Sequence, residues 1–233
     1  GIWPWARLRV PSGSLTAPTM FHIDQIGVPP ASLPANRVVN SGMMDFEALG
    51  FTSPFSTPLE ITLQYYDDSG PLTVYRYDTA LGWQQIPTKT VDPVAHIITV
   101  DAISLSVYAV LMQVTPDVEI APPTAAGSGY PGDVLTYTFT VTNTGDYSDT
   151  VALAASGVWT PTLSTYSLAG LGSGLSESVT MTVTIPLTAM HGVSDTAVVT
   201  ATSTISPTMS PVSQATTTVR WHTIYLPLVM RQG

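Results

Sequence analysis

The stretch VLTYTFTVTN, residues Val134–Asn143, alternates large apolar residues with threonine over four consecutive cycles. Side chains of a β-strand point alternately to its two faces, so Tyr137, Phe139 and Val141 share one face and the threonines share the other. Antiparallel sheets commonly bury one face and leave the other in water, and β-branched threonine suits the solvated face. We therefore predict a half-buried antiparallel strand.

The same alternation recurs along the chain. ESVTMTVTIP, residues 177–186, repeats it with valine, methionine and isoleucine on one face and threonine on the other. Turn-forming clusters such as DDSGP, NTGD, AGLGSG and SPTMSP separate the apolar runs. The best helical candidate, Met43–Phe51, is short and reads equally well as a strand. The pattern predicts an all-β protein.

Two tandem β-sandwiches account for the spacing of the strands. In the first half we expect eight strands, at 6–10, 19–26, 38–49, 59–66, 72–77, 83–86, 96–100 and 106–112. In the second half we expect seven, at 118–120, 134–143, 150–155, 164–168, 179–185, 197–203 and 215–221. Seven strands fit an immunoglobulin-like sandwich. The predicted domains are 1–114 and 115–221, and an apolar C-terminal strand occupies 222–233.

Composition favours an extracellular or cell-surface location. The 233 residues carry a net charge of -9, contain no cysteine, and include a single lysine, Lys89. No lysine or arginine lies between Asp117 and Val219, so the second half offers no cationic face for nucleic acid. Abundant serine and threonine are typical of exported surface proteins. No signal peptide begins at Gly1, so an exported chain would be the processed form. The longest apolar runs are shorter than the ~20 residues of a membrane-spanning helix.

Three parts of the chain resemble modules known from other proteins. PGDVLTYTFTVTNTGDYSDTVAL, residues 131–153, resembles the immunoglobulin-like repeats of secreted and cell-surface bacterial proteins, and the likeness covers 117–220. VPSGSL, LTVYRYDTALGW and ISLSVYAVLM resemble the sandwich domain of zona-occludens proteins and netrin receptors, over 6–112. IYLPLVMR resembles the tails of large secreted proteins of some bacteria. These resemblances imply scaffolds, stalks and interaction modules without a conserved catalytic residue.

No catalytic motif emerges, and we predict a protein that is not an enzyme and has no cofactor and no metal site. The histidines occur singly, without the paired spacing of a zinc site. They are His22, His96, His191 and His222. GLGSG at Gly170–Gly174 lacks the lysine of a phosphate-binding loop and reads as a hairpin turn.

Two acidic pairs and one lysine leave alternatives open. Asp67 with Asp68 and Asp146 with Asp149 fall in turns, where they suit either calcium or ordinary Asx turns. Each pair supplies fewer oxygens than calcium prefers. An internal isopeptide crosslink would require Lys89, which lies in the turn-like PTKTVDP and is unsuited to a buried crosslink.

A carbohydrate-binding face would require exposed aromatic platforms. The candidates lie on neighbouring strands of the first half, although alternation places some of them in the core. They are Tyr65, Tyr66, Tyr75, Tyr77 and Trp83.

The C-terminal segment TIYLPLVM, residues 223–230, is apolar on both faces of an extended chain. Burial of each large side chain is worth ~1.5 to 3 kcal/mol, against ~1 to 2 kcal/mol for ordering each residue of backbone. Because the gain exceeds the cost by only a small margin, the segment needs a groove, and not a flat surface, to bind in. The predicted assembly strand comprises Ile224, Tyr225, Leu226, Leu228, Val229 and Met230. The amino-terminal counterpart comprises Ile2, Trp3, Trp5 and Leu8.

Because both ends of the chain carry apolar residues that need a partner, we predict head-to-tail assembly in which one subunit donates its terminal strand to the next. Pro227 cannot donate a hydrogen bond, so the strand would require an edge position or a bulge. Folding of TIYLPLVM onto its own chain is the competing arrangement. We predict an extracellular structural protein, a homopolymer forming a filament or surface layer. The alternative is a non-catalytic module of a larger secreted protein that binds polysaccharide or attaches it to a cell surface.

Overall fold

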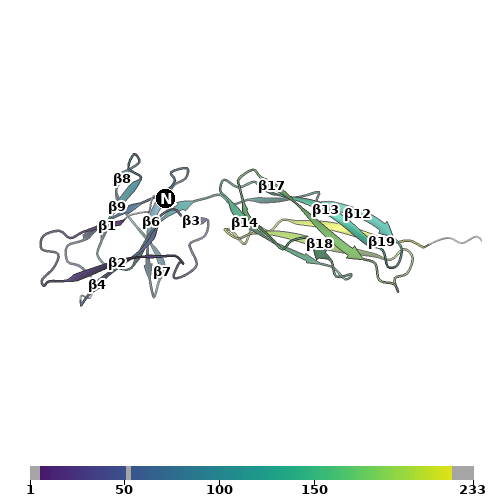
Figure 1. The fold of residues 1–233 in the computed structure, drawn as a ribbon, viewed down its shortest axis with the longest axis horizontal. Helices are drawn as coiled ribbons and strands as arrows, with labels where there is room; N and C mark the ends of the chain where they lie inside the picture. Colours follow the sequence, from purple (N-terminus) through teal and green to yellow (C-terminus); the bar gives the residue numbers. More distant parts are fainter. Residues whose placement is uncertain (1–5, 51–53, 222–233) are drawn as a thin grey trace, which may run out of the picture. The chain divides into compact units, whose positions relative to one another are not determined.

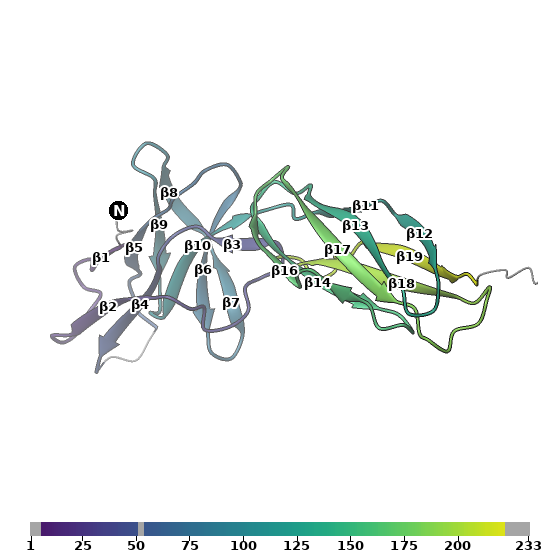
Figure 2. The same cartoon turned by 45° about the vertical axis from the view of Figure 1, so that its right-hand side comes forward.

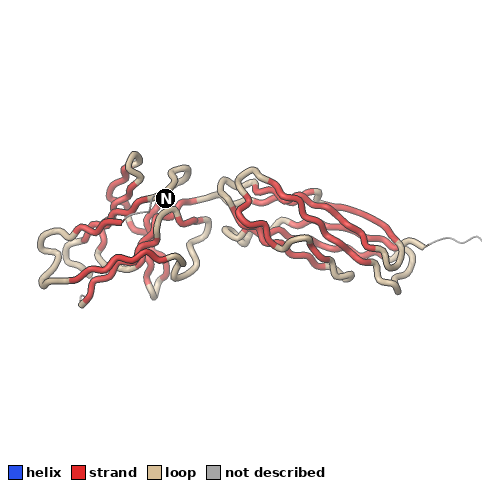
Figure 3. Tube along the Cα trace, viewed as in Figure 1, coloured by secondary structure: helices blue, strands red, loops and turns tan. Residues whose placement is uncertain are grey.

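The computed structural model describes residues 6–50 and 54–221, and every regular element among them is a β-strand (Figures 1 and 3). This confirms the all-β fold class. The contacts divide the chain into unit 1, Gly1–Thr115, and unit 2, Pro116–Gly233. Ile2, Trp3, Trp5 and the predicted assembly strand at 224–230 lie outside the described residues.

Unit 1 contains two antiparallel sheets facing one another. One has the strand order β1-β5-β9-β8, and the other has β2-β4-β10-β6-β7 with β3 also paired to β10. The strands are β1 (Ala6–Arg9), β2 (Met20–Ile26), β3 (Arg37–Val39), β4 (Met43–Leu49), β5 (Leu59–Gln64), β6 (Leu72–Asp78), β7 (Gly82–Ile86), β8 (Thr88–Asp92), β9 (Ile97–Ala102) and β10 (Val107–Gln113).

Strand β10 is buried on both faces, unlike the half-solvated strands that the alternation predicts. Tyr108 and Val110 pack in the core between the sheets. Ala109 and Leu111 belong to a second cluster on the other side, against which Leu33 packs. The loop before β3 therefore covers this face, and an uninterrupted apolar run is the expected sequence of a strand without a wet side.

Two features of unit 1 differ from the predicted strands. The single strand predicted over 38–49 is divided into β3 and β4, because Asn40 and Ser41 turn inward and bond to β10. The Asn40 N–H donates to the carbonyl of Val110, whose own N–H donates to Ser41 Oγ. Strand β8 was expected to be a turn. It is an exposed edge strand, so no buried face marks it in the sequence.

Unit 2 is a sandwich of two sheets with the strand orders β11-β13-β17-β15 and β12-β19-β18-β14-β16 (Figure 2). The strands are β11 (Val118–Ala121), β12 (Thr124–Gly129), β13 (Val134–Asn143), β14 (Asp149–Ser156), β15 (Thr162–Leu163), β16 (Ser167–Leu171), β17 (Ser176–Thr184), β18 (Ser194–Ser203) and β19 (Val212–Val219). This arrangement is immunoglobulin-like, because β11, β13, β17 and β15 take the A-B-E-D order of one immunoglobulin sheet, and β19, β18 and β14 take the places of G, F and C in the other. The edge strands depart from the immunoglobulin pattern, because β15 at the D position precedes β16, the strand beside C, in the sequence.

Strand β13 has the bounds and faces that VLTYTFTVTN predicts. Tyr137, Phe139 and Val141 enter the core of unit 2, where Tyr137 lies opposite Met181 and Phe139 opposite Val179 of β17. The threonines lie on the outer face, where pairs such as Thr138 and Thr180 oppose one another across the sheet. Alternation therefore identifies both the strand and its buried side.

Strand β12 was not predicted, because TAAGSG has no apolar alternation. It runs parallel to β19. A Cβ at Gly127 would lie 2.7 Å from Leu135 Cδ2 and 2.8 Å from Tyr137 Oη, so any larger residue would force these side chains of β13 to shift. The contact is set by residues on another strand, which explains why the local sequence does not reveal it.

Candidate functional site

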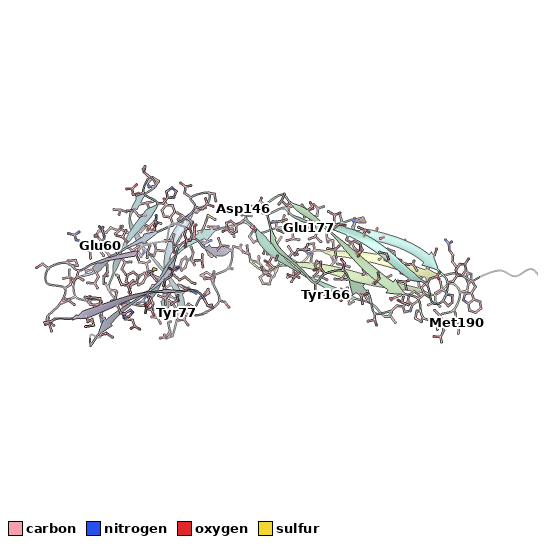
Figure 4. The ribbon with its side chains drawn as sticks, in the orientation of Figure 1. Glu60, Tyr77, Asp146, Tyr166, Glu177 and Met190 are labelled. Carbon is pink, nitrogen blue, oxygen red and sulfur yellow. The ribbon has the colours of Figure 1, made fainter. Side chains whose placement is uncertain are left out.

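The predicted aromatic platform is largely internal. Tyr65 and Tyr75 are buried, whereas Tyr66 is 55% exposed. Tyr77 and Trp83 are half-buried, and their rings make an edge-to-face contact with centroids 5.5 Å apart. Figure 4 marks Tyr77 within unit 1. Trp83 Nε1 donates to the carbonyl of Ala31, 3.3 Å away, which ties the indole to the covering loop. Tyr75, Tyr77 and Trp83 therefore belong to the second cluster of unit 1, whereas Tyr65 lies in the core between the sheets.

Lys89 belongs to an ion-pair row on the exposed side of the β1-β5-β9-β8 sheet. Its Nζ lies 2.8 Å from Asp101 Oδ1 and 3.1 Å from Glu60 Oε2. Hydrogen bonds to Asp101 and Glu60 raise the pKa of Lys89. Amide formation would require a neutral amine beside a protonated carboxyl group, the opposite of this exposed ion pair. The structure corrects the predicted turn at Lys89 to a strand and supports no crosslink there.

Two of the carboxylates considered for calcium, Asp67 and Asp149, accept hydrogen bonds from neighbouring donors. Ser69 donates its hydroxyl to Asp67 Oδ2 at 2.8 Å and its N–H to Asp67 Oδ1 at 2.9 Å, and these hydrogen bonds lower the pKa of Asp67. Asp149 is buried and accepts hydrogen bonds from the hydroxyls of Ser203 and Thr204. Across 6–50 and 54–221, no three histidine or acidic side chains gather into a metal-binding group.

Tyr108 and the histidines are placed as structural groups. The buried Tyr108 hydroxyl donates to the carbonyl of Ser104 at 2.6 Å, and burial raises the pKa of Tyr108 to about 12. His22 Nε2 lies 2.8 Å from Asp24 Oδ2, and the His96 ring packs on Tyr65 at a centroid distance of 5.1 Å. His191 is exposed, and His222 lies outside the described residues.

Three carboxylates gather on one face of the β2–β4 pair. Asp24 lies directly opposite Asp45, and His22 lies opposite Glu47. Burial, followed by the charges of Glu47 and Asp24, raises the pKa of Asp45, while His22 acts in the opposite direction. Because folding raises this pKa, the contribution of Asp45 to stability is greatest below its unfolded pKa. That contribution declines as the pH rises through the pKa of the folded state.

Asp45→Asn is therefore expected to stabilise unit 1 at neutral pH. Like charges directly opposite one another in a sheet destabilise it by a fraction of a kcal/mol, so we expect a gain on the order of 0.5 kcal/mol. Thermal melting at pH 7 and pH 4 measures it. The gain should shrink at the lower pH and at high salt. Asp92→Asn, in the exposed edge strand β8, is the control, and a gain that does not change with pH would contradict the explanation.

Exposed apolar side chains gather at one end of unit 2, which we call the apolar end. Its members are Tyr130, Val134, Leu187, Met190, Val193 and Trp221. Leu187 is 82% exposed, Met190 69% and Trp221 57%. Backbone hydrogen bonds join the contributing segments, from Gly132 to Ile185 and from Arg220 to Gly129. Figure 4 marks Met190 at this end, where β19 finishes and the chain continues toward TIYLPLVM.

A groove of about 370 Å³ follows the opposite part of unit 2, between β16 and the start of β17. We call it the β16–β17 groove. Its lining residues are Ser167, Leu168, Ala169, Gly170, Leu171, Gly172, Leu175, Ser176 and Glu177. The sequence alone does not indicate this groove, because GLGSG gives only a turn signal and the position of β16 at a sheet edge depends on distant strands.

Of the predicted adhesive residues, Leu8 alone is described. It is half-buried on β1, opposite Ile61, and packs against the core of its own unit. The sequence did not single out Leu187, Met190 or Leu175, because isolated apolar residues in turns show no periodicity. Within the described part of the chain, no helix is long and apolar enough to span a membrane.

Comparison with known proteins finds solved structures that are similar at low identity and low TM-score. No family model and no curated protein matches the chain. A PapD-like domain of a human protein matches with 16% identity and a TM-score of 0.35, covering 46% of this chain and 87% of that one. A Porphyromonas gingivalis protein of unknown function matches with 8% identity and a TM-score of 0.33, covering 85% and 99%. Domains 4 and 5 of an S-layer protein match with 14% identity and a TM-score of 0.27, covering 86% and 97%.

Proposed function

We propose that the chain is an extracellular structural protein whose copies join head to tail, through the apolar end of unit 2, into a filament or surface layer. The apolar end of unit 2 is the observation that carries this proposal. Contiguous exposed apolar surface on a soluble protein commonly marks an interaction site. Trp221 of the apolar end lies two residues before TIYLPLVM, so the exposed apolar end and the apolar C-terminal segment are adjacent in the sequence.

The outer face of β13 and β17 in the same unit contrasts with this end. There, threonine and serine oppose one another, as in the hydroxyl pair of Thr142 with Ser176, and Thr162 of β15 continues the row beside Thr182. Such hydroxyl rows are compatible with water and give little apolar area to a partner. A contact between this end of one subunit and a different surface of the next is heterologous, and it propagates if it does not close on itself.

A polysaccharide-binding module is the competing proposal. It requires aromatic faces that a sugar ring can cover. Among the five aromatic candidates, Tyr66 alone is largely exposed. The buried positions of Tyr65 and Tyr75 therefore favour the structural role.

Removal of residues 223–230 tests the proposal. We expect the intact chain to form concentration-dependent oligomers, and the deleted chain to sediment as a monomer. The double variant Met190→Ser, Trp221→Ser should weaken association at least about tenfold, because burial of each large apolar side chain at a contact contributes roughly 1.5 kcal/mol or more. Sedimentation velocity and electron microscopy measure both effects.

The matched control is Val94→Ser, which changes an exposed apolar residue in unit 1. It should leave the oligomers unchanged. An intact chain that stays monomeric at all concentrations, or oligomers that persist after the deletion, would disprove the proposed function.

A further inference from the structure

We propose that the β16–β17 groove is the acceptor site for TIYLPLVM of a second copy of the chain. This inference rests on the proposed function and specifies which surface receives the terminal segment. The contact would add an extended strand to the open edge of β17 and place its apolar side chains against the groove.

Strand β17 has an open edge beside the groove. On one side it pairs with β13 along its length. On the other side the short β15 pairs with it only at Met181 and Thr182, and Ser164 N–H donates to the carbonyl of Thr180. Backbone groups of alternate residues point to the same side of a strand, so those of Ser176 and Ser178 face the same way as Thr180. No strand within 6–50 or 54–221 covers them.

The groove offers apolar contacts at that edge. Leu171 is buried, and Leu168 packs half-buried against the core of unit 2. Leu175 is 60% exposed at the start of β17 and stands over Gly172, where an added Cβ would lie 3.1 Å from Leu175 Cδ1. The glycines leave room between the edge strands, and an inserted segment would cover Leu175.

The length of the chain favours a second copy as the source of the segment. Trp221 follows β19 at the end of unit 2 where Ser194 pairs with Thr218, whereas the groove lies near Asp149, at the opposite end of β18. Ten residues of β18 span about 30 Å at the usual strand rise. Nine residues, the length of 222–230, could span at most about as far when fully extended, so only the last residues of TIYLPLVM would reach the groove of their own unit.

Charge and backbone chemistry also fit this occupant. Glu177 lines the groove, and Arg231 follows Met230 directly in the sequence. An opposite charge beside the apolar segment would fix its direction in the groove. The added strand would hydrogen-bond on one side only, so Pro227 can point its nitrogen away from β17, as proline does in edge strands.

Disulfide trapping between two different chains tests the acceptor site, since the natural chain has no cysteine. One full-length variant carries Leu175→Cys, and the other carries Leu226→Cys or Leu228→Cys. After mixing and mild oxidation, we expect the mixed disulfide at least about tenfold above the pairing of the same tail variants with Val94→Cys, because docking raises the local concentration of the thiols. Mixed disulfide no more abundant than with Val94→Cys would overturn the acceptor assignment.

A second pair of variants tests the open edge without depending on the crosslink. Ser178→Pro removes an N–H that faces away from β13, while Ser178→Ala keeps it. We expect the proline variant to weaken association at least about tenfold more than the alanine variant, with circular dichroism confirming that both remain folded. Equal association of the two variants would contradict strand addition at β17.

The outcomes separate the two proposals. Oligomers that require residues 223–230 but give no crosslink and no response to Ser178→Pro would retain the proposed function and overturn the acceptor site. Absence of oligomers under every condition would overturn both. A crosslink within a single chain carrying both Leu175→Cys and Leu228→Cys, with none between mixed chains, would overturn the second copy as the source.

Discussion

Phe139→Ala is expected to lower the free energy of unfolding of unit 2 by about 3 to 5 kcal/mol, the usual cost of removing a buried phenylalanine. The Phe139 side chain is fully buried in the core, and its residue pairs with Val179 of the adjacent strand. Loss of the ring removes apolar contact from both sheets and leaves a cavity that the closely packed strands fill only in part.

Urea denaturation followed by circular dichroism measures this loss. Thr140→Ala is the control, because Thr140 is the next residue on β13 and its side chain is exposed. Its effect should stay within about 0.5 kcal/mol. A loss below about 1 kcal/mol for Phe139→Ala would show that this residue does not hold the two sheets together.

Asn143→Ala is expected to cost about 3 kcal/mol, because it breaks three hydrogen bonds of a buried side chain. Asn143 ends β13 and is 1% exposed. Its Nδ2 donates to the carbonyls of Leu171 at 2.7 Å and Tyr147 at 2.8 Å, and its Oδ1 accepts from the N–H of Gly145 at 3.0 Å. The side chain thus joins the NTG turn to β16, and buried backbone groups would lose their partners without it.

Asn143→Asp separates hydrogen bonding from volume. The carboxylate has nearly the same shape but places an acceptor against the carbonyls of Leu171 and Tyr147, so we expect a loss at least as large as that of alanine. Thr144→Ala, an exposed neighbour in the same turn, should change little. Denaturation midpoints of the three variants make the comparison. Full stability of Asn143→Asp would rule out this hydrogen-bond network as the anchor of the turn.

The accuracy of the sequence prediction varies with how local the determining interactions are. The bounds of β13 were predicted to the residue, because its buried and exposed positions alternate without interruption. β8 and β12 were missed. β8 has no buried face, and β12 depends on the approach of Gly127 to Leu135 and Tyr137. The aromatic residues near Trp83 suggested a binding face, but the loop containing Ala31 covers part of that group.

The sequence by itself determined that the protein is built of β-strands, which face of β13 is buried, and that unit 2 has almost no cationic surface. These properties follow from residue type and a period of two, which act locally. Tertiary structure alone decided that Tyr65 and Tyr75 are internal, that Leu187 and Met190 lie at one end, and that β17 has an open edge beside Leu175. Each of these depends on pairing between segments far apart in the chain, and strand pairing leaves no periodic signal in either partner alone.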